Sequence, residues 1–201
     1  MIHSALQFLT GELDTYLNNK AGTSGVPRVL LTAVSSEGKL AIPNKTLGLS
    51  LMNIEEDRSV RDQRNVVRNE SGTYEFRNPD LYLNLYVLIT ANFNNSDNNT
   101  STDDYAEGLK QLSHVIGFFQ SRSVFVPSAY PGMALLDPDM ERLTVEMFSF
   151  TFEQMHNFWS LVGASYMPSV LYKVRMLTIQ ENELTPPPGV VETIGLNLKG
   201  N

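Results

Sequence analysis

The chain begins with apolar residues at helical spacing. They recur at steps of three and four: Ile2, Leu6, Leu9, Leu13 and Leu17. This spacing places them on one face of an amphipathic helix, and Gly22 follows as a typical helix end. The sequence therefore predicts a first helix that packs one face on a core.

Strand-like alternation marks most of the remaining apolar segments. Strands are predicted over 28–34, 46–54, 81–93, 142–150 and 169–180, with a short apolar patch at 124–126. Segment 81–93 is apolar on both faces, which is typical of a strand in the interior of a sheet.

Two further segments have helical patterns. The first has a predicted buried stripe made of Tyr105, Leu109, Leu112, Ile116 and Phe119. The second opens with Thr151 and Gln154, which resemble a capping box, and ends at Gly163. Its predicted inner face contains Met155, Phe158, Trp159 and Val162. Trp159 is interpreted as a core residue rather than an exposed anchor, and the Pro-containing segment 127–138 as a loop.

The order of these elements predicts an α+β, or mixed α/β, fold. A central sheet, mostly antiparallel or mixed, would be packed by about three helices. We expect a single domain over residues 1–180 and a Pro-rich C-terminal arm over 181–201. Pro186–Pro188 stiffens the start of this arm, and weak strand alternation follows.

Charge and composition narrow the classes of function. The net charge of −7 disfavours general binding to nucleic acid, and the absence of cysteine excludes thiolate chemistry and disulfides. No segment approaches the roughly 20 consecutive apolar residues of a membrane span. The first residues lack the basic region of a signal peptide, so we expect a cytoplasmic protein with no membrane partner.

No pattern of reactive residues emerges. His3, His114 and His156 lie far apart, and no nucleophile-elbow, zinc-helix or phosphate-loop motif is present. The acidic run at 55–57 is interpreted as a solvated strand end rather than a cation site. We therefore predict no catalytic, metal or cofactor-binding residues, and an enzyme, such as a small hydrolase, is the less favoured hypothesis.

Two segments are candidates for protein interfaces. Segment 55–80 predicts a long loop or a protruding hairpin and is rich in arginine: Arg58, Arg61, Arg64, Arg68 and Arg77. Arginine favours ion pairs at interfaces, but a solvated loop explains the pattern equally well. The arm supplies alternating apolar residues suited to strand addition: Val190, Val191, Ile194, Leu196 and Leu198. A disordered terminus and a last strand of the same domain are the alternatives.

Nearly the whole chain resembles one family. The resemblance rests on three runs, LYLNLYVLITANF, YAEGLKQLSHVIGFFQSRSVF and LTVEMFSFTFEQMHNFWSLVGASYMPSVLYKVRMLTIQ, and extends to NIEED at 53–57 and GVVETI at 189–194. In this order they resemble the cap, or tail-terminator, proteins of extracellular contractile injection systems, which are phage-tail-like particles of the antifeeding-prophage and virulence-cassette type.

The resemblance implies a structural subunit without catalytic residues. It would form a six-membered ring at the distal end of the particle, contact the inner tube and the sheath, and stop their polymerisation. The protein would be made in the cytoplasm and then become part of a particle that is released from the cell. The alternative is an assembly chaperone or adaptor that is not itself a component of the particle.

Overall fold

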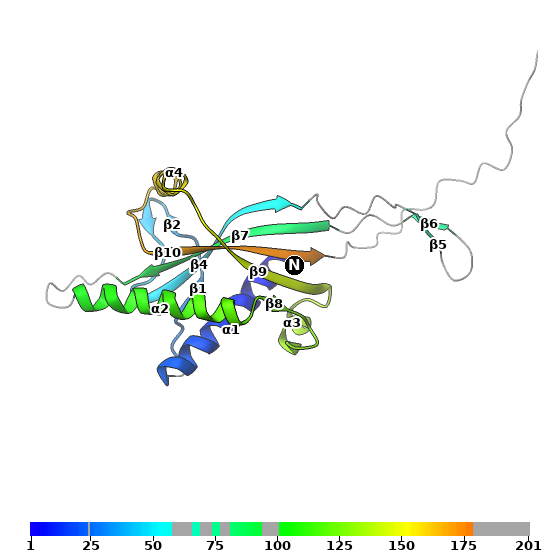
Figure 1. Ribbon diagram of the computed structural model, residues 1–201, viewed down its shortest axis with the longest axis horizontal. Coiled ribbons are helices and arrows are strands. Elements are labelled where there is room, and N and C mark those ends of the chain that lie inside the picture. Colours follow the sequence, from blue (N-terminus) through cyan, green and yellow to red (C-terminus); the bar gives the residue numbers. More distant parts are fainter. Residues whose placement is uncertain (24, 58–65, 69–73, 77–80, 94–100, 179–201) are drawn as a thin grey trace, which may run out of the picture.

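A six-stranded sheet forms the centre of the molecule (Figure 1). The structure is a computed structural model and describes residues 1–23, 25–57, 66–68, 74–76, 81–93 and 101–178. The sheet contains β1 (Val29–Leu31), β4 (Thr46–Glu56), β7 (Leu81–Asn92), β8 (Val124–Phe125), β9 (Met140–Phe148) and β10 (Ser169–Thr178). Two small two-stranded sheets accompany it, β2 (Ser35–Ser36) with β3 (Lys39–Leu40), and β5 (Val66–Arg68) with β6 (Tyr74–Phe76).

The order of the strands is β1-β4-β7-β10-β9-β8. β1 runs parallel to β4, and every other pair in this sheet is antiparallel. The predicted α+β fold with a mixed sheet is therefore confirmed. β7 lies between β4 and β10, as its two apolar faces predicted, and Leu85, Val87, Leu88 and Ile89 are all buried there.

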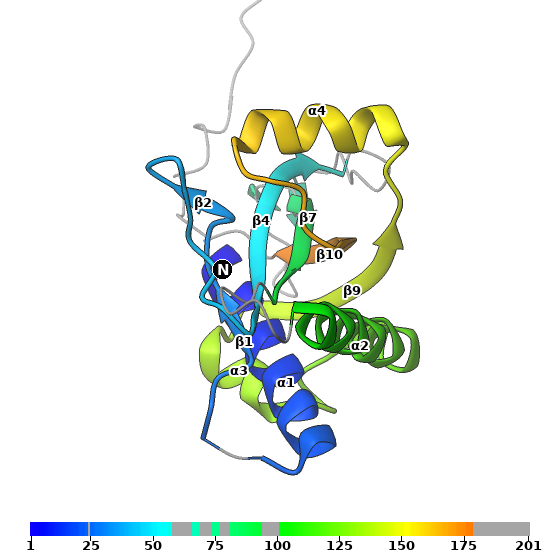
Figure 2. The same ribbon diagram turned by 90° about the vertical axis from the view of Figure 1, so that its left-hand side faces the viewer.

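Helices cover both faces of the sheet (Figures 1 and 2). On one face, α1 (Ile2–Ala21), α2 (Ser101–Ser121) and α3 (Pro131–Leu136) enclose the larger hydrophobic core. On the other face, α4 (Phe152–Val162) and the β2–β3 hairpin cover a smaller one. This second core contains Val34, Leu88, Trp159, Met167 and Leu171. The Ser35 hydroxyl donates a hydrogen bond of 2.8 Å to the carbonyl of Val162, which ties the hairpin to the end of α4.

The predicted first helix is confirmed as α1. Leu6, Leu9, Leu13 and Leu17 are buried, and Gly22 ends the helix with φ of 63°, a conformation that favours glycine. The same helix also holds the edge strand in place. The Asp14 carboxylate accepts hydrogen bonds from the backbone N–H groups of Arg28 and Val29, at 2.6 and 3.0 Å.

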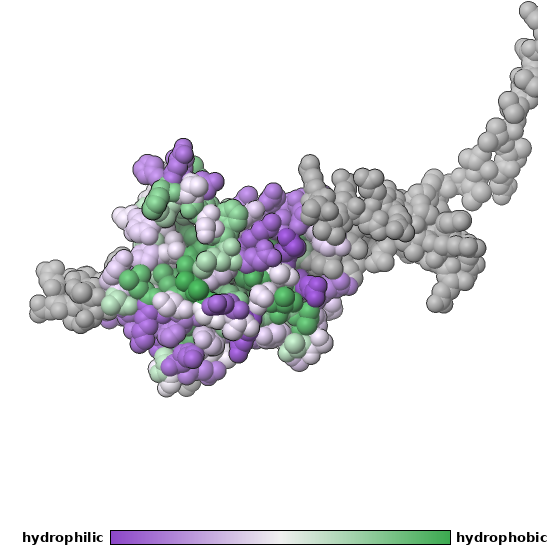
Figure 3. All heavy atoms as spheres, viewed as in Figure 1, coloured by the Kyte–Doolittle hydropathy of each residue, from purple (hydrophilic) through white to green (hydrophobic). Residues whose placement is uncertain are grey.

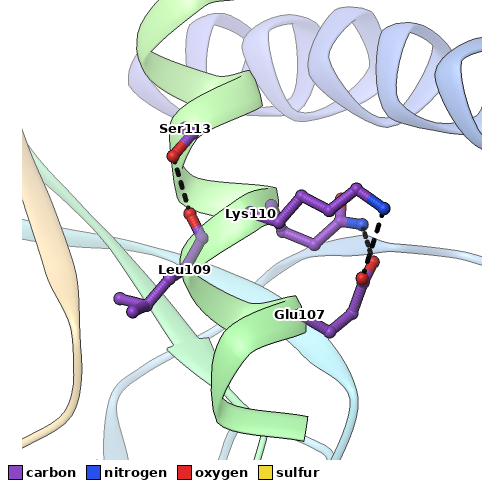
Figure 4. Close-up of polar contacts among 5 residues, drawn as sticks. Glu107, Leu109, Lys110 and Ser113 are labelled. Carbon is purple, nitrogen blue, oxygen red and sulfur yellow. Dashed lines mark hydrogen bonds and ion pairs between the residues drawn. The ribbon is translucent and has the colours of Figure 1, made fainter. Parts of the chain in front are cut away.

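The predicted buried stripe of α2 was wrong at two positions. Tyr105 and Leu109 are exposed, whereas Leu112, Val115, Phe118 and Phe119 are buried. Figure 4 shows the Leu109 side chain pointing away from Glu107, whose carboxylate accepts hydrogen bonds from Gln111 at 2.6 Å and Lys110 at 3.5 Å. The hydrogen bond from Gln111 is the main cause that lowers the pKa of Glu107, and Lys110 lowers this pKa further. Burial acts in the opposite direction and raises it. The helix is thus rotated relative to the predicted stripe.

The predicted loop 127–138 contains a helix, which is the second correction. α3 is only six residues long, has Pro131 in its first turn and buries Met133. The described part of the chain therefore has four helices rather than about three. α4 agrees with its prediction, because Thr151 and Gln154 form both hydrogen bonds of a capping box and Gly163 ends the helix at φ of 68°.

Two further predictions concern membrane-spanning helices and the C-terminal arm. None of the helices in the described ranges is long and apolar enough to cross a membrane. The C-terminal arm, predicted over 181–201, lies outside the described residues.

Candidate functional site

The arginine-rich segment contains a two-stranded hairpin. β5 and β6 pair in antiparallel register, with Val66 opposite Phe76 and Arg68 opposite Tyr74. The pair lies beyond the end of the six-stranded sheet (Figure 1). The hairpin interpretation of this segment is thus correct for the residues that are described. Of the predicted interface residues, Arg68 ends β5, whereas Arg58, Arg61, Arg64 and Arg77 lie outside the described residues.

Polar contacts surround the end of the β4–β7 pair, where β4 ends at Glu56 and β7 begins at Leu81. The Asp57 backbone N–H donates a hydrogen bond of 2.8 Å to the carbonyl of Tyr82. Arg175 of β10 forms an ion pair of 3.2 Å with the Asp57 carboxylate. The Tyr86 hydroxyl donates a hydrogen bond of 2.7 Å to Glu55, and this bond is the main cause that raises the pKa of Tyr86. Glu55 and Glu56 are exposed, as predicted for a solvated strand end, whereas Asp57 is partly buried and forms the ion pair with Arg175.

An apolar groove of about 240 Å³ lies where α4 crosses the ends of β9 and β10. Its lining contains no charged side chain and consists of Leu88, Met147, Phe148, Ser149, Phe150, Met155, Phe158, Trp159, Ser169, Val170 and Leu171. Hydrophobic residues gather on this side of the molecule, between α4 and α2, in Figure 3. Sequence reasoning missed this groove, because the lining residues come from four elements whose packing the apolar pattern does not reveal.

Several large apolar side chains are exposed outside this groove. Leu161 and Phe152 on α4 are 90% and 88% exposed, and Leu135 on α3 is 86% exposed. Trp159, in contrast, is 6% exposed, so its interpretation as a core residue is confirmed. Aromatic residues and Met are enriched at protein interfaces. The surface that includes α4, Met147 and Phe148 therefore has the composition of a contact surface.

The described ranges contain no group of three or more His, Cys, Asp or Glu residues that could hold a metal ion. The buried Tyr172 hydroxyl has no hydrogen-bond partner among the described residues, and burial raises its pKa to about 12. This hydroxyl is therefore protonated at neutral pH.

The five predicted interface residues of the C-terminal arm, Val190, Val191, Ile194, Leu196 and Leu198, lie outside the described residues. Of the ten predicted interface residues, the structure therefore places Arg68 alone.

The sequence matches one protein family over nearly its whole length. The profile described as the Pvc16 N-terminal domain covers residues 5–193. No curated protein sequence matches the chain.

Two solved structures share the fold. One is described as the PVC sheath/tube terminator of an extracellular contractile injection system in the extended state. It is 15% identical, with a TM-score of 0.56, over 100% of this chain and 65% of that chain. The other is described as the anti-feeding prophage cap, the AFP tube terminating cap. It is 15% identical, with a TM-score of 0.54, over 94% of this chain and 58% of that chain. The chain thus spans less than two thirds of the length of either structure.

Proposed function

This chain belongs to the family of the Pvc16 N-terminal domain, and we propose that it is a structural cap subunit of a contractile injection particle. It would form a ring on the distal end of the particle, contact both the inner tube and the sheath, and end their polymerisation.

The observation that carries this proposal is the agreement between family and fold. The family profile covers residues 5–193, and both similar structures are described as terminating components of such particles. The fold resembles theirs over 94% or more of this chain.

A ring of identical copies explains how a small subunit can terminate a large tube. Each copy would use two different surfaces for its two neighbours, and such a head-to-tail contact closes into a ring when the rotation is right. We propose six copies. Many weak contacts repeated around the ring give strong overall binding without one tight site. The outer face would lack the surface that recruits the next layer, so growth stops there.

The hairpin and the arm are the proposed contact elements. Asp57 forms an ion pair with Arg175 at the end of β4, and the arginine-rich segment follows it in the sequence. The arginines of this segment, Arg58, Arg61, Arg64, Arg68 and Arg77, would contact a neighbouring copy or the tube. Residues 1–180 would form one domain, from which 181–201 extends as an arm. Strand addition by 190–198 would join a neighbouring copy or a sheath subunit.

The proposed mechanism is steric and needs no catalytic group, metal or cofactor. Its partners are other copies of the chain and the sheath and tube subunits, rather than nucleic acid or a membrane. The subunit would join the particle in the cytoplasm and leave the cell as part of it.

The test is assembly in the presence and absence of this chain. The chain is coexpressed with the sheath and tube subunits of its particle, and the products are imaged by electron microscopy and counted by mass spectrometry. We expect a ring at one end of particles of uniform length, present at a few copies per particle, and tubes of irregular length when the chain is omitted. Uniform particles that lack the chain would show instead that it is an assembly chaperone or adaptor.

A further inference from the structure

The strand pairing around the groove under α4 is incomplete. Ser169 and Val170 of β10 pair with β7, but the pairing of β10 with β9 starts only at Leu171, opposite Phe148. On the outer side of β9, β8 pairs with Leu143 and Thr144 only, and Val145 donates a hydrogen bond to Ser123. Among the described residues, positions 146–148 of β9 thus have a strand neighbour on one side only. Backbone groups at such an edge can pair with an added strand.

The side chains around this edge are apolar and partly exposed. Met147 is 52% and Phe148 is 37% exposed. The Phe148 ring contacts Phe150 at a centroid distance of 6.1 Å, and Phe150 in turn stacks on Phe158 at 6.0 Å. Exposed aromatic and Met side chains on a rigid support are typical of the centre of a protein interface.

The size of the groove limits what it can bind. Pockets for small-molecule ligands and cofactors usually measure about 300–1,000 Å³ and contain a few polar groups that fix orientation. This groove measures about 240 Å³. The polar side-chain groups of its lining residues are the hydroxyls of Ser149 and Ser169 and the indole N–H of Trp159. It suits one or two apolar side chains of a peptide strand better than a cofactor.

We propose that residues 190–198 of a neighbouring copy dock in this groove as an added strand along the edge of β9. Ile194, Leu196 and Leu198 alternate with Thr193, Gly195 and Asn197. A strand with this pattern presents one apolar face to the groove and one small or polar face to solvent. The inference rests on the proposed function, because it assigns a partner surface within the proposed ring.

The direction of β10 favours a neighbouring copy over the same chain. β10 starts at the groove and carries the chain about 30 Å away from it, to Thr178. Residues 179–189 then separate Thr178 from Val190, and they include the stiff Pro186–Pro188. Fully extended, they reach about 36 Å. Return to the same groove requires a reversal of direction and nearly the full reach of these residues, whereas docking on a neighbouring copy requires neither.

Cysteine crosslinking tests this contact, because the chain has no cysteine of its own. Full-length Met147→Cys and Leu196→Cys variants are mixed, assembled with tube and sheath subunits, and treated with a short bifunctional maleimide. We expect at least about tenfold more covalent dimer than from Leu161→Cys mixed with Leu196→Cys, since docking raises the local concentration of the thiols. Leu161 is a suitable control because it is 90% exposed on the opposite side of α4 from Trp159.

The other outcomes separate this inference from the proposed function. Crosslinking within one chain, measured as a monomer of the Met147→Cys/Leu196→Cys double variant, overturns docking between copies. A ring that assembles on the tube with no crosslink above the control overturns the inference but leaves the proposed function intact. Failure of the unmodified chain to cap the tube overturns the proposed function, and the inference with it.

Discussion

Trp159 and Leu161 lie two residues apart on α4 and have opposite environments. Trp159 is 6% exposed, whereas Leu161 is 90% exposed. The centroid of the Trp159 ring lies 5.4 Å from that of Phe158 and 5.7 Å from that of Tyr166. A buried tryptophan that is truncated leaves a cavity, while an exposed leucine leaves none.

We expect Trp159→Ala to lower the free energy of unfolding by about 3–5 kcal/mol. Leu161→Ala should change it by less than about 0.5 kcal/mol. Urea denaturation followed by circular dichroism measures both values. Equal effects of the two substitutions would contradict the assignment of Trp159 to the core of the α4 face.

The sequence identifies some residue environments better than others. Trp159 was assigned correctly because Met155, Phe158 and Val162 lie on the same helical face. The ion pair of Arg175 with Asp57 was not foreseen, since it joins residues more than a hundred positions apart through the register of a sheet. Helical spacing is visible in the sequence, whereas the pairing partner of a strand residue is not.

At the scale of elements, regular patterns predicted the long strands and helices α1 and α4. α2 was predicted as a helix but with the wrong buried face, because Val115, Ile116, Phe118 and Phe119 make more than one face apolar. Its orientation is set by tertiary contacts, such as Tyr16 of α1 against Phe118 at 5.0 Å. α3 was missed because six residues are too few to show a helical period.

The arginine-rich segment 55–80 gives a testable prediction about the role of one element in assembly. Arg61→Glu/Arg64→Glu reverses two charges of the proposed contact segment. We expect unchanged circular dichroism and unchanged thermal unfolding, because the substitutions leave every residue of the two described cores intact. If the arginines pair with acidic groups of a neighbour or of the tube, the variant should fail to form capped particles.

A control must separate specific contacts from net charge. Lys20→Glu/Lys39→Glu reverses the same number of charges at two exposed positions on α1 and β3, away from the hairpin. The control variant should assemble normally, as judged by the length of particles in electron micrographs. Normal particle length with the arginine variant would place the hairpin outside the contacts of the ring.

At the scale of the whole molecule, the chain combines a well-packed body with surfaces that are suited to other chains. Two hydrophobic cores, one on each face of the sheet, are formed by residues of the described part of the chain. The exposed Leu135, Phe152 and Leu161 of α3 and α4 lie outside these cores. The apolar groove opens onto the second core, with which it shares Leu88, Trp159 and Leu171, and Met147 and Phe148 form its exposed side. This division predicts that folding and assembly depend on different parts of the sequence.

Removal of residues 181–201 tests this division directly. Because the described residues of both cores lie before residue 179, we expect the 1–180 chain to unfold cooperatively at nearly the same temperature as the full chain. It should nevertheless dock poorly on tube and sheath subunits, and the resulting particles should vary in length. A full-length variant with Ile194, Leu196 and Leu198 each replaced by Ser keeps the length of the arm but removes its apolar face, and it should show the same defect. Capped particles of normal length from both variants would mean that the body alone terminates the tube.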